Sequence, residues 1–299
     1  MKNEFAIRQM GRKERNIMLY REQNAQRALS PTSITIADYV INPFVGCDFN
    51  CVYCYARLNS TYLKKKEKLG EDFVESKPNF LALLEKEISE KRPRHVLLGS
   101  TTEVYQHIEE RTTVTRSILD ILNKNNTSYT ILTKSHRIVR DLDLIGASPD
   151  NEVYFTVNTL DDAVRQALEP AASSIHERKV AISALHANKI RVIVHAGPYI
   201  PGITDPRALV YEFAAMCPLI EFESLNLKMA DRTTLLEKLK EHYPHAYNEV
   251  QLLYKSKEAY GDTYRIAEQQ VTDIAAKRGI ESRFFIYPYD SYYTNQIQY

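Results

Sequence analysis

Short apolar or β-branched runs alternate with longer amphipathic stretches from about residue 37 onward, and this alternation limits the possible folds more than any other feature. In residues 78–91, for example, Phe80, Leu84 and Ile88 recur at helical spacing and would share one face. Strands that alternate with helices predict βαβ units around a parallel sheet. Further helices are expected at residues 113–124, 174–187 and 206–216, and strands at 38–41, 95–99, 129–133, 153–157, 191–195 and 222–228.

Six such units are too few to close an eight-stranded barrel. We therefore expect the α/β class, with a partial (β/α)6 TIM-like barrel at residues 31–245 and an extension at each end. The N-terminal extension, residues 1–30, is basic and is expected to be a helix plus a flexible arm. The C-terminal extension, residues 246–299, should be helical, broken near Gly261, with a final strand at 283–287 and a tyrosine-rich tail.

The composition is that of an ordinary globular protein, because 44% of the 299 residues are hydrophobic and 26% are charged. No apolar run of about 18 residues occurs, so we expect no membrane-spanning helix and no membrane partner. The N-terminus lacks the uninterrupted apolar stretch of a secretory signal, and we expect a cytoplasmic protein with reduced thiols. A net charge of +1 neither supports nor excludes nucleic acid as a partner.

Three of the four cysteines, Cys47, Cys51 and Cys54, form a C-x3-C-x2-C pattern directly after the first expected strand. Such crowding indicates a metal site rather than a disulfide framework. Thiolates suit iron–sulfur clusters, and three of them would leave one iron of a 4Fe-4S cluster open for catalysis. The remaining cysteine, Cys217, lies in an apolar stretch and is expected to be buried.

Zinc is the alternative ligand for these cysteines. A structural zinc site has four protein ligands, usually in two separated pairs, but this chain has no second C-x-x-C and no histidine in the loop. On this interpretation the chain would be a non-catalytic, zinc-stabilised nucleic-acid-binding module, with its basic N-terminal arm on the nucleic acid.

The loop resembles the C-x3-C-x-aromatic-C signature of the radical S-adenosylmethionine (SAM) superfamily, with Tyr53 as the aromatic residue. More narrowly, residues 41–57, 99–122, 131–145, 168–185 and 192–206 resemble the spore photoproduct lyase-like family, also called DNA repair photolyases. The resemblance implies a 4Fe-4S cluster on Cys47, Cys51 and Cys54, with SAM chelated by the open iron. It further implies reductive cleavage of SAM to a 5′-deoxyadenosyl radical, which abstracts hydrogen from a substrate.

The resemblance also implies cofactor contacts. Tyr53 would lie beside the adenine, and the loop from Ser100 to Glu103 would meet the amino group of the methionine part. Lys134 would contact its carboxylate. Asn158 would contact SAM from the end of the fourth strand, and the backbone at Ala196 would lie near the adenine.

Several of these residues have simpler interpretations. Lys134 could be a solvated lysine, and Asn158 could cap the following helix. Arg178 fits a substrate or cofactor contact as well as the edge of an amphipathic helix. His195, at a strand end, is expected to be a packing residue rather than a base.

The chain departs from authentic spore photoproduct lyases in a way that affects the substrate. Ser100 stands where those enzymes carry a cysteine that returns a hydrogen atom, and Glu103-Val104-Tyr105 stands where many relatives read Asp-Pro-Tyr. A hydroxyl is a far poorer hydrogen-atom donor than a thiol. The expected substrate is therefore a nucleic-acid lesion, or else a peptide, sugar or small metabolite, and the expected electron donor is a flavodoxin or ferredoxin.

Overall fold

The computed structural model describes residues 5–6, 18–58, 60–227 and 232–289. Its main feature is an eight-stranded sheet in the order β12-β11-β10-β9-β8-β7-β4-β3. Within this sheet the seven strands from β4 to β12 pair in parallel, whereas β3 pairs antiparallel to β4 at one edge. The strands are β3 (Ser30–Pro31), β4 (Tyr39–Ile41), β7 (His95–Leu98), β8 (Ser128–Thr133), β9 (Glu152–Thr156), β10 (Arg191–Tyr199), β11 (Leu219–Ser224) and β12 (Glu281–Phe285).

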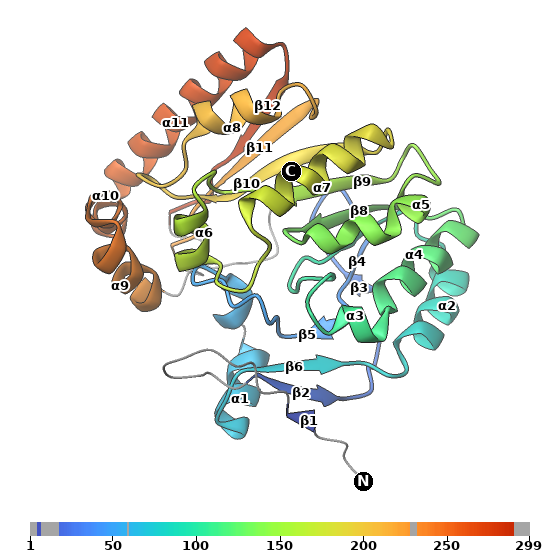
Figure 1. Cartoon of the computed structure of the whole chain (residues 1–299). Coiled ribbons are helices and arrows are strands. Elements are labelled where there is room, and N and C mark those ends of the chain that lie inside the picture. Colours follow the sequence, from blue (N-terminus) through green and yellow to red (C-terminus); the bar gives the residue numbers. More distant parts are fainter. Residues whose placement is uncertain (1–4, 7–17, 59, 228–231, 290–299) are drawn as a thin grey trace.

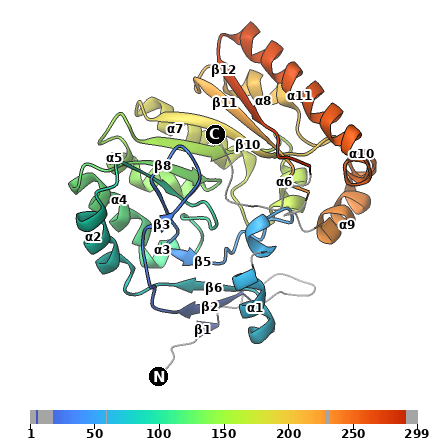
Figure 2. The same ribbon diagram turned by 180° about the vertical axis from the view of Figure 1, so that it is seen from behind.

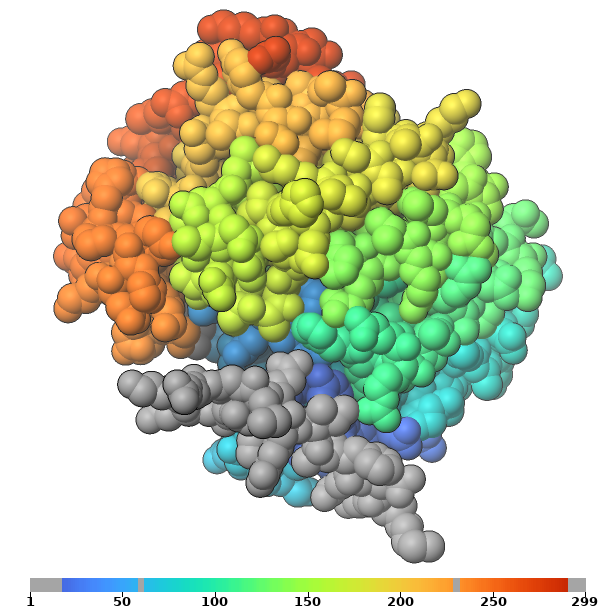
Figure 3. All heavy atoms as spheres, in the orientation of Figure 1, coloured from blue at the N-terminus to red at the C-terminus, as the bar shows by residue number. Residues whose placement is uncertain are grey.

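Helices cover the outer face of this sheet (Figure 1). They are α2 (Phe80–Lys91), α3 (Glu109–Thr112), α4 (Val114–Lys124), α5 (Leu142–Ile145), α6 (Asp162–Leu168), α7 (Ile175–Ala187) and α8 (Pro206–Phe213). Short 3-10 turns lie at His136–Asp141 and, after the cysteine loop, at Tyr55–Leu58. In the space-filling view, the segments coloured cyan to yellow form a continuous outer layer (Figure 3). The α/β class and the partial barrel are therefore confirmed, with β12 as a seventh parallel strand.

The two faces of the sheet differ because successive side chains in a strand point to opposite sides. Val96, Ile131, Phe155 and Val194 face the helices and belong to the main hydrophobic core. The alternate positions face inward, where Tyr154, Ile193 and Leu219 form a smaller cluster. The cavity described below lies on this inner face, at the carboxyl ends of the strands.

The N-terminal region forms strands instead of the expected helix, as far as the described residues show. A second sheet has the order β1-β2-β6-β5, from β1 (Phe5–Ala6), β2 (Leu19–Glu22), β6 (Phe73–Ser76) and β5 (Phe44–Val45). Figure 2 shows it below the large sheet, next to α1 (Ser60–Leu69). Phe73 and Val74 are fully buried, so β6 needs strand partners, and β2 supplies one by pairing Leu19 with Phe73.

The C-terminal helices are α9 (Arg232–His242), α10 (Pro244–Lys255) and α11 (Lys257–Arg278). The expected break near Gly261 is wrong, because it falls at Ser256, whose side chain accepts a hydrogen bond from Ala259 N at 3.1 Å. Gly279 ends α11 in the left-handed conformation. The final strand β12 starts two residues before the expected strand and pairs with β11.

The domain boundaries at residues 30 and 245 stay predictions. Most of the tyrosine-rich tail, from residue 290 on, lies outside the described residues, as do Lys228 of the expected sixth strand and four of the basic N-terminal side chains (Arg8, Arg12, Lys13 and Arg15). No helix in the described part of the chain combines the length and apolarity needed to span a bilayer.

Candidate active site

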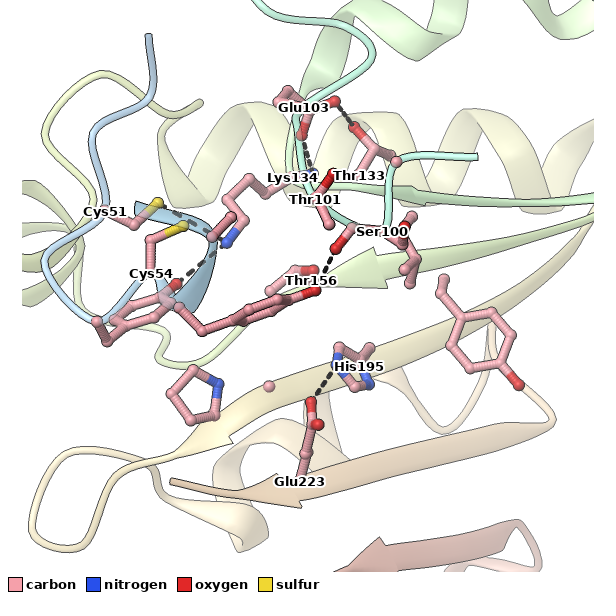
Figure 4. A pocket seen from close by; sticks show the side chains of 18 of the residues that line it. Cys51, Cys54, Ser100, Thr101, Glu103, Thr133, Lys134, Thr156, His195 and Glu223 are labelled. Atoms are coloured by element: carbon pink, nitrogen blue, oxygen red, sulfur yellow. Dashed lines mark hydrogen bonds and ion pairs between the residues drawn. The ribbon is translucent and has the colours of Figure 1, made fainter. Parts of the chain in front are cut away.

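A cavity lies on the inner face of the sheet, between the carboxyl ends of its strands and the cysteine loop. Figure 4 shows Cys51, Cys54 and Lys134 on one side of it, and His195 with Glu223 on another. The predicted site residues that line it are Cys47, Cys51, Cys54, Tyr53, Ser100, Glu103 and Lys134. The cavity therefore brings together the residues of three successive strand-to-helix loops.

The cysteine loop is fixed to its surroundings by backbone contacts. Val52 N donates to Leu168 O at 2.9 Å, and Thr102 Oγ1 donates to Gly46 O at 2.6 Å. Gly46 has φ +84°, and a Cβ atom there would clash with the carbonyl of Phe73. A glycine before the first cysteine lets the loop pass closely over β6.

The three thiols are free, with Cys51 buried and the other two partly exposed. Burial raises the pKa of Cys51 to about 12, and burial with the nearby Asp48 raises the pKa of Cys47 well above its usual value. Thiols in such surroundings are protonated at neutral pH, so binding of iron by these cysteines would release protons.

The arrangement fits a cluster better than a single ion. Among the described residues, no group of three or more His, Cys, Asp or Glu side chains is placed to hold one metal ion. A structural zinc site needs four ligands around one ion. In a 4Fe-4S cluster each thiolate binds a different iron, so three thiolates need not converge on a single point. The donor set therefore supports the cluster over the zinc alternative.

Lys134 lies directly against the cysteine loop. Its Nζ is 3.8 Å from Cys51 Sγ, 3.1 Å from Tyr53 Oη and 3.9 Å from Glu169 Oε1. Burial by itself lowers the pKa of Lys134, but the charges of Cys51 and Glu169 outweigh burial and raise it. The side chain is only 17% exposed, which rules out a solvated surface lysine.

Behind Lys134 lies a buried ionic network that the sequence did not reveal. Glu169 accepts hydrogen bonds from the hydroxyl of Tyr53 and from the guanidinium of Arg178. Arg178 is completely buried and also donates to Ser173 O at 2.9 Å and Thr156 O at 3.1 Å. Arg178 is therefore not a surface helix edge, since it holds the residues that position Tyr53.

Asn158 and Ala196 do not line the cavity. Asn158 Nδ2 donates to Tyr53 Oη at 2.8 Å, while its buried Oδ1 has no hydrogen-bond partner in the described part of the chain. It does not cap α6, because Asp161 does. The Ala196 side chain lies in the core on the helix side of the sheet, paired with Phe222. SAM contacts by Asn158 and by the backbone at Ala196 stay predictions.

Glu103 and Ser100 organise the loop after β7. Glu103 is buried and accepts from Thr133 Oγ1 at 2.7 Å and Lys134 N at 3.0 Å, so it holds the turn that carries Lys134. Burial raises the pKa of Glu103, although these hydrogen bonds partly offset the effect. Ser100 O accepts from the Tyr55 hydroxyl, and Ser100 Oγ lies 3.0 Å from Asn42 Nδ2.

A second polar group lines the wall formed by β9 to β11. His195 Nδ1 is 3.1 Å from Glu221 Oε1, and His195 Nε2 is 3.3 Å from Glu223 Oε2. The Tyr287 hydroxyl donates to Glu223 Oε1. Burial alone lowers the pKa of His195, but the two glutamates outweigh it and raise that pKa to about 9. β10 continues to Tyr199, so His195 is not at a strand end and is not mere packing.

Comparisons with known proteins show what this chain is similar to. The family model of the radical SAM superfamily matches residues 41–214. An uncharacterized protein of Methanocaldococcus jannaschii is 31% identical over 226 residues, which cover 75% of this chain and 83% of that protein. An uncharacterized protein of Mycobacterium tuberculosis is 30% identical over 175 residues, about half of its own length (51%).

Solved structures share the fold. Spore photoproduct lyase complexed with dinucleoside spore photoproduct superposes with a TM-score of 0.60 at 14% identity, covering 90% of this chain and 82% of that one. A variant of that enzyme with bound AdoMet and the same dinucleoside gives a TM-score of 0.60 at 15% identity, covering 89% and 81%.

Proposed function

Because the chain belongs to the radical SAM superfamily, whose members use a 4Fe-4S cluster and SAM, we propose that Cys47, Cys51 and Cys54 hold the cluster and that the cavity binds SAM and a substrate. The chain is an enzyme. When bound, the two cofactors supply a 5′-deoxyadenosyl radical that can abstract hydrogen from the substrate.

One observation carries this proposal: three free thiols and a buried ammonium group share one wall of a cavity that continues past them along the sheet. The ammonium of Lys134 suits the carboxylate of the methionine part of SAM. The space beyond, toward β9 to β11, is left for the substrate.

The other residues have positioning roles in this proposal. Glu169 and Arg178 fix the hydroxyl of Tyr53, whose ring would lie beside the adenine. Glu103 fixes the backbone of Lys134. The loop carrying Ser100 would face the amino group of the methionine part. The apolar walls of the cavity would keep water away from a reactive radical.

SAM binding tests the proposal directly. The anaerobically reconstituted and reduced protein should show the electron paramagnetic resonance signal of a 4Fe-4S cluster, and SAM should change that signal. Lys134→Ala should keep the cluster and weaken SAM binding at least tenfold, because it removes the only lysine on the described cavity wall. Lys255→Ala, on exposed α10, is the matched control. Absence of the cluster, or a signal unaffected by SAM, would contradict the proposal.

Repair of a nucleic-acid lesion is the second candidate, favoured by the shared fold with spore photoproduct lyase. The reduced protein, with flavodoxin or ferredoxin as electron donor, would then convert dinucleoside spore photoproduct to thymidine units. SAM consumption without these units would rule out repair and leave a peptide, sugar or small metabolite. We expect the latter result, because the cavity offers Ser100 and no thiol besides the three loop cysteines among its described lining.

A further inference from the structure

The wall of the cavity formed by β9 to β11 has more acidic than basic side chains. Glu221 and Glu223 lie on either side of His195, at 3.1 and 3.3 Å from its two ring nitrogens. One histidine can supply at most one positive charge against two carboxyl groups. Tyr287 is a neutral hydrogen-bond donor to Glu223. The group as a whole therefore has a deficit of positive charge, whichever form His195 takes.

Nearby basic side chains do not make up this deficit. Among the described residues that line the cavity, only Lys134 and His195 are basic, and Lys134 contacts Cys51 and Glu169. Arg283 is the cross-strand neighbour of Glu221, but it is exposed and does not line the cavity. Charges inside a cavity are screened less than charges in solvent. The excess negative charge therefore attracts a bound cation and repels a bound anion.

Two hydroxyl groups on β9, the strand next to His195, lack hydrogen-bond partners in the described structure. Tyr154 is 5% exposed and Thr156 is 6% exposed, and both line the cavity. Thr156 is the cross-strand neighbour of His195, and the Tyr154 ring centroid lies 6.2 Å from that of His195. Neither hydroxyl forms a hydrogen bond with another described residue. Both hydroxyls open onto the cavity, where they can accept hydrogen bonds from a bound molecule.

Gly197 leaves room for the ion pair of His195 and Glu223. A Cβ atom at position 197 would clash with His195 Nε2 and would lie 2.9 Å from Glu223 Oε2. A side chain at this position would displace the His195 ring and the Glu223 carboxylate. Glu221 uses Oε1 for His195, and in the part of the chain that the structure describes no hydrogen bond reaches its Oε2. That oxygen is a free acceptor on the cavity wall.

We propose that Glu221, Glu223, Tyr154 and Thr156 form a recognition site for a cationic nitrogen group of the substrate, such as an amine, amidine or guanidine. The inference rests on the proposed function, because it assumes that the cavity is the active site. A cation would balance the acidic pair, while its N–H groups would donate to Glu221 Oε2 and the two hydroxyls. A phosphate or carboxylate at this position would be repelled.

Three flat probes of similar shape test the site: benzamidine, which is cationic, benzamide, which is neutral, and benzoate, which is anionic. Their binding to the reconstituted protein with SAM is measured by titration calorimetry. We expect benzamidine to bind at least tenfold more tightly than benzamide, and benzoate to bind most weakly. Equal binding of the three, a preference for benzoate, or no binding of benzamidine would each overturn the inference.

Variants test whether Glu221 and Glu223 cause the preference for benzamidine. Glu221→Gln and Glu223→Gln should each weaken benzamidine binding at least fivefold and leave benzamide binding within twofold of the native protein. Glu241→Gln, on exposed α9, should change neither. Benzamidine binding unaffected by both cavity variants would also overturn the inference. The SAM-dependent cluster signal is recorded on the same samples, so failure of the proposed function is seen separately from failure of this site.

Discussion

At the residue scale, the site divides into residues that a local pattern reveals and residues that only the fold brings together. The cysteines and Tyr53 lie within one short loop, so their spacing alone was enough to predict them as site residues. Glu169 was not predicted as a site residue, because its partners Tyr53 and Arg178 lie 116 and 9 residues away in the sequence. Glu221 and Glu223 left one overlooked signal, since two acidic residues at alternate positions of an apolar strand must share a face.

Arg178→Leu should destabilise the fold by about 3–5 kcal/mol, because it removes the closer of the two ionic partners of the buried Glu169 carboxylate and leaves only Lys134 at 3.9 Å. Arg265→Met is the control, since Arg265 pairs with Asp262 on the surface and should cost less than about 1 kcal/mol. Chemical denaturation measures both. Equal and small effects would show that Glu169 does not depend on Arg178.

The pKa of His195, raised to about 9 from a usual 6.5, makes its stabilising effect depend on pH. Between these values the folded chain binds the proton and the unfolded chain does not. The contribution of His195 is therefore complete below about pH 6.5 and is lost as the pH rises through about 9, a change on the order of 3 kcal/mol. The charged and titratable groups in contact with it are Glu221, Glu223 and Tyr154.

Denaturation at several pH values, compared with His195→Gln, isolates this effect from other titrating groups. The difference in unfolding free energy between native and variant should fall across that range. A difference that stays constant or grows with pH would contradict the ion pairs.

At the scale of elements, the strands and helices with strong periodicity lie where the sequence predicts them. The elements that were missed or misplaced have local causes. The parallel strands and α2, α4, α7 and α8 lie within a few residues of their expected positions. The small second sheet was missed because its strands are short and pair over long separations, as Leu19 does with Phe73. The helix break was misplaced because a serine cap outweighed a glycine.

Ser256→Ala should lower the free energy of unfolding by about 1 kcal/mol, because it removes the side-chain cap of α11. Gly261→Ala should instead raise it by about 0.5–1 kcal/mol, since Gly261 lies inside the helix and a Cβ atom there meets nothing within 4 Å. Thermal or urea unfolding of the pair checks both signs. Destabilisation by Gly261→Ala would restore the break at that glycine.

At the scale of the whole molecule, the sheet determines where the cavity lies. Parallel strands place their carboxyl ends along one edge, so residues from Cys47 to Glu223 share a cavity although they are far apart in sequence. The fold class and the place of the cysteine loop could be predicted because alternation and spacing are visible along the chain. The polar wall of β9 to β11 could not, because its chemistry arises from neighbouring strands and from Tyr287 near the C-terminal end.

The most direct test of the central claim is the formation of 5′-deoxyadenosine. The reconstituted native protein, reduced with dithionite and given SAM without oxygen, should release it in amounts measurable by mass spectrometry. The variant with Cys47→Ala, Cys51→Ala and Cys54→Ala should release none. Formation of 5′-deoxyadenosine by both proteins, or by neither, would contradict the assignment of these cysteines to a cluster that cleaves SAM.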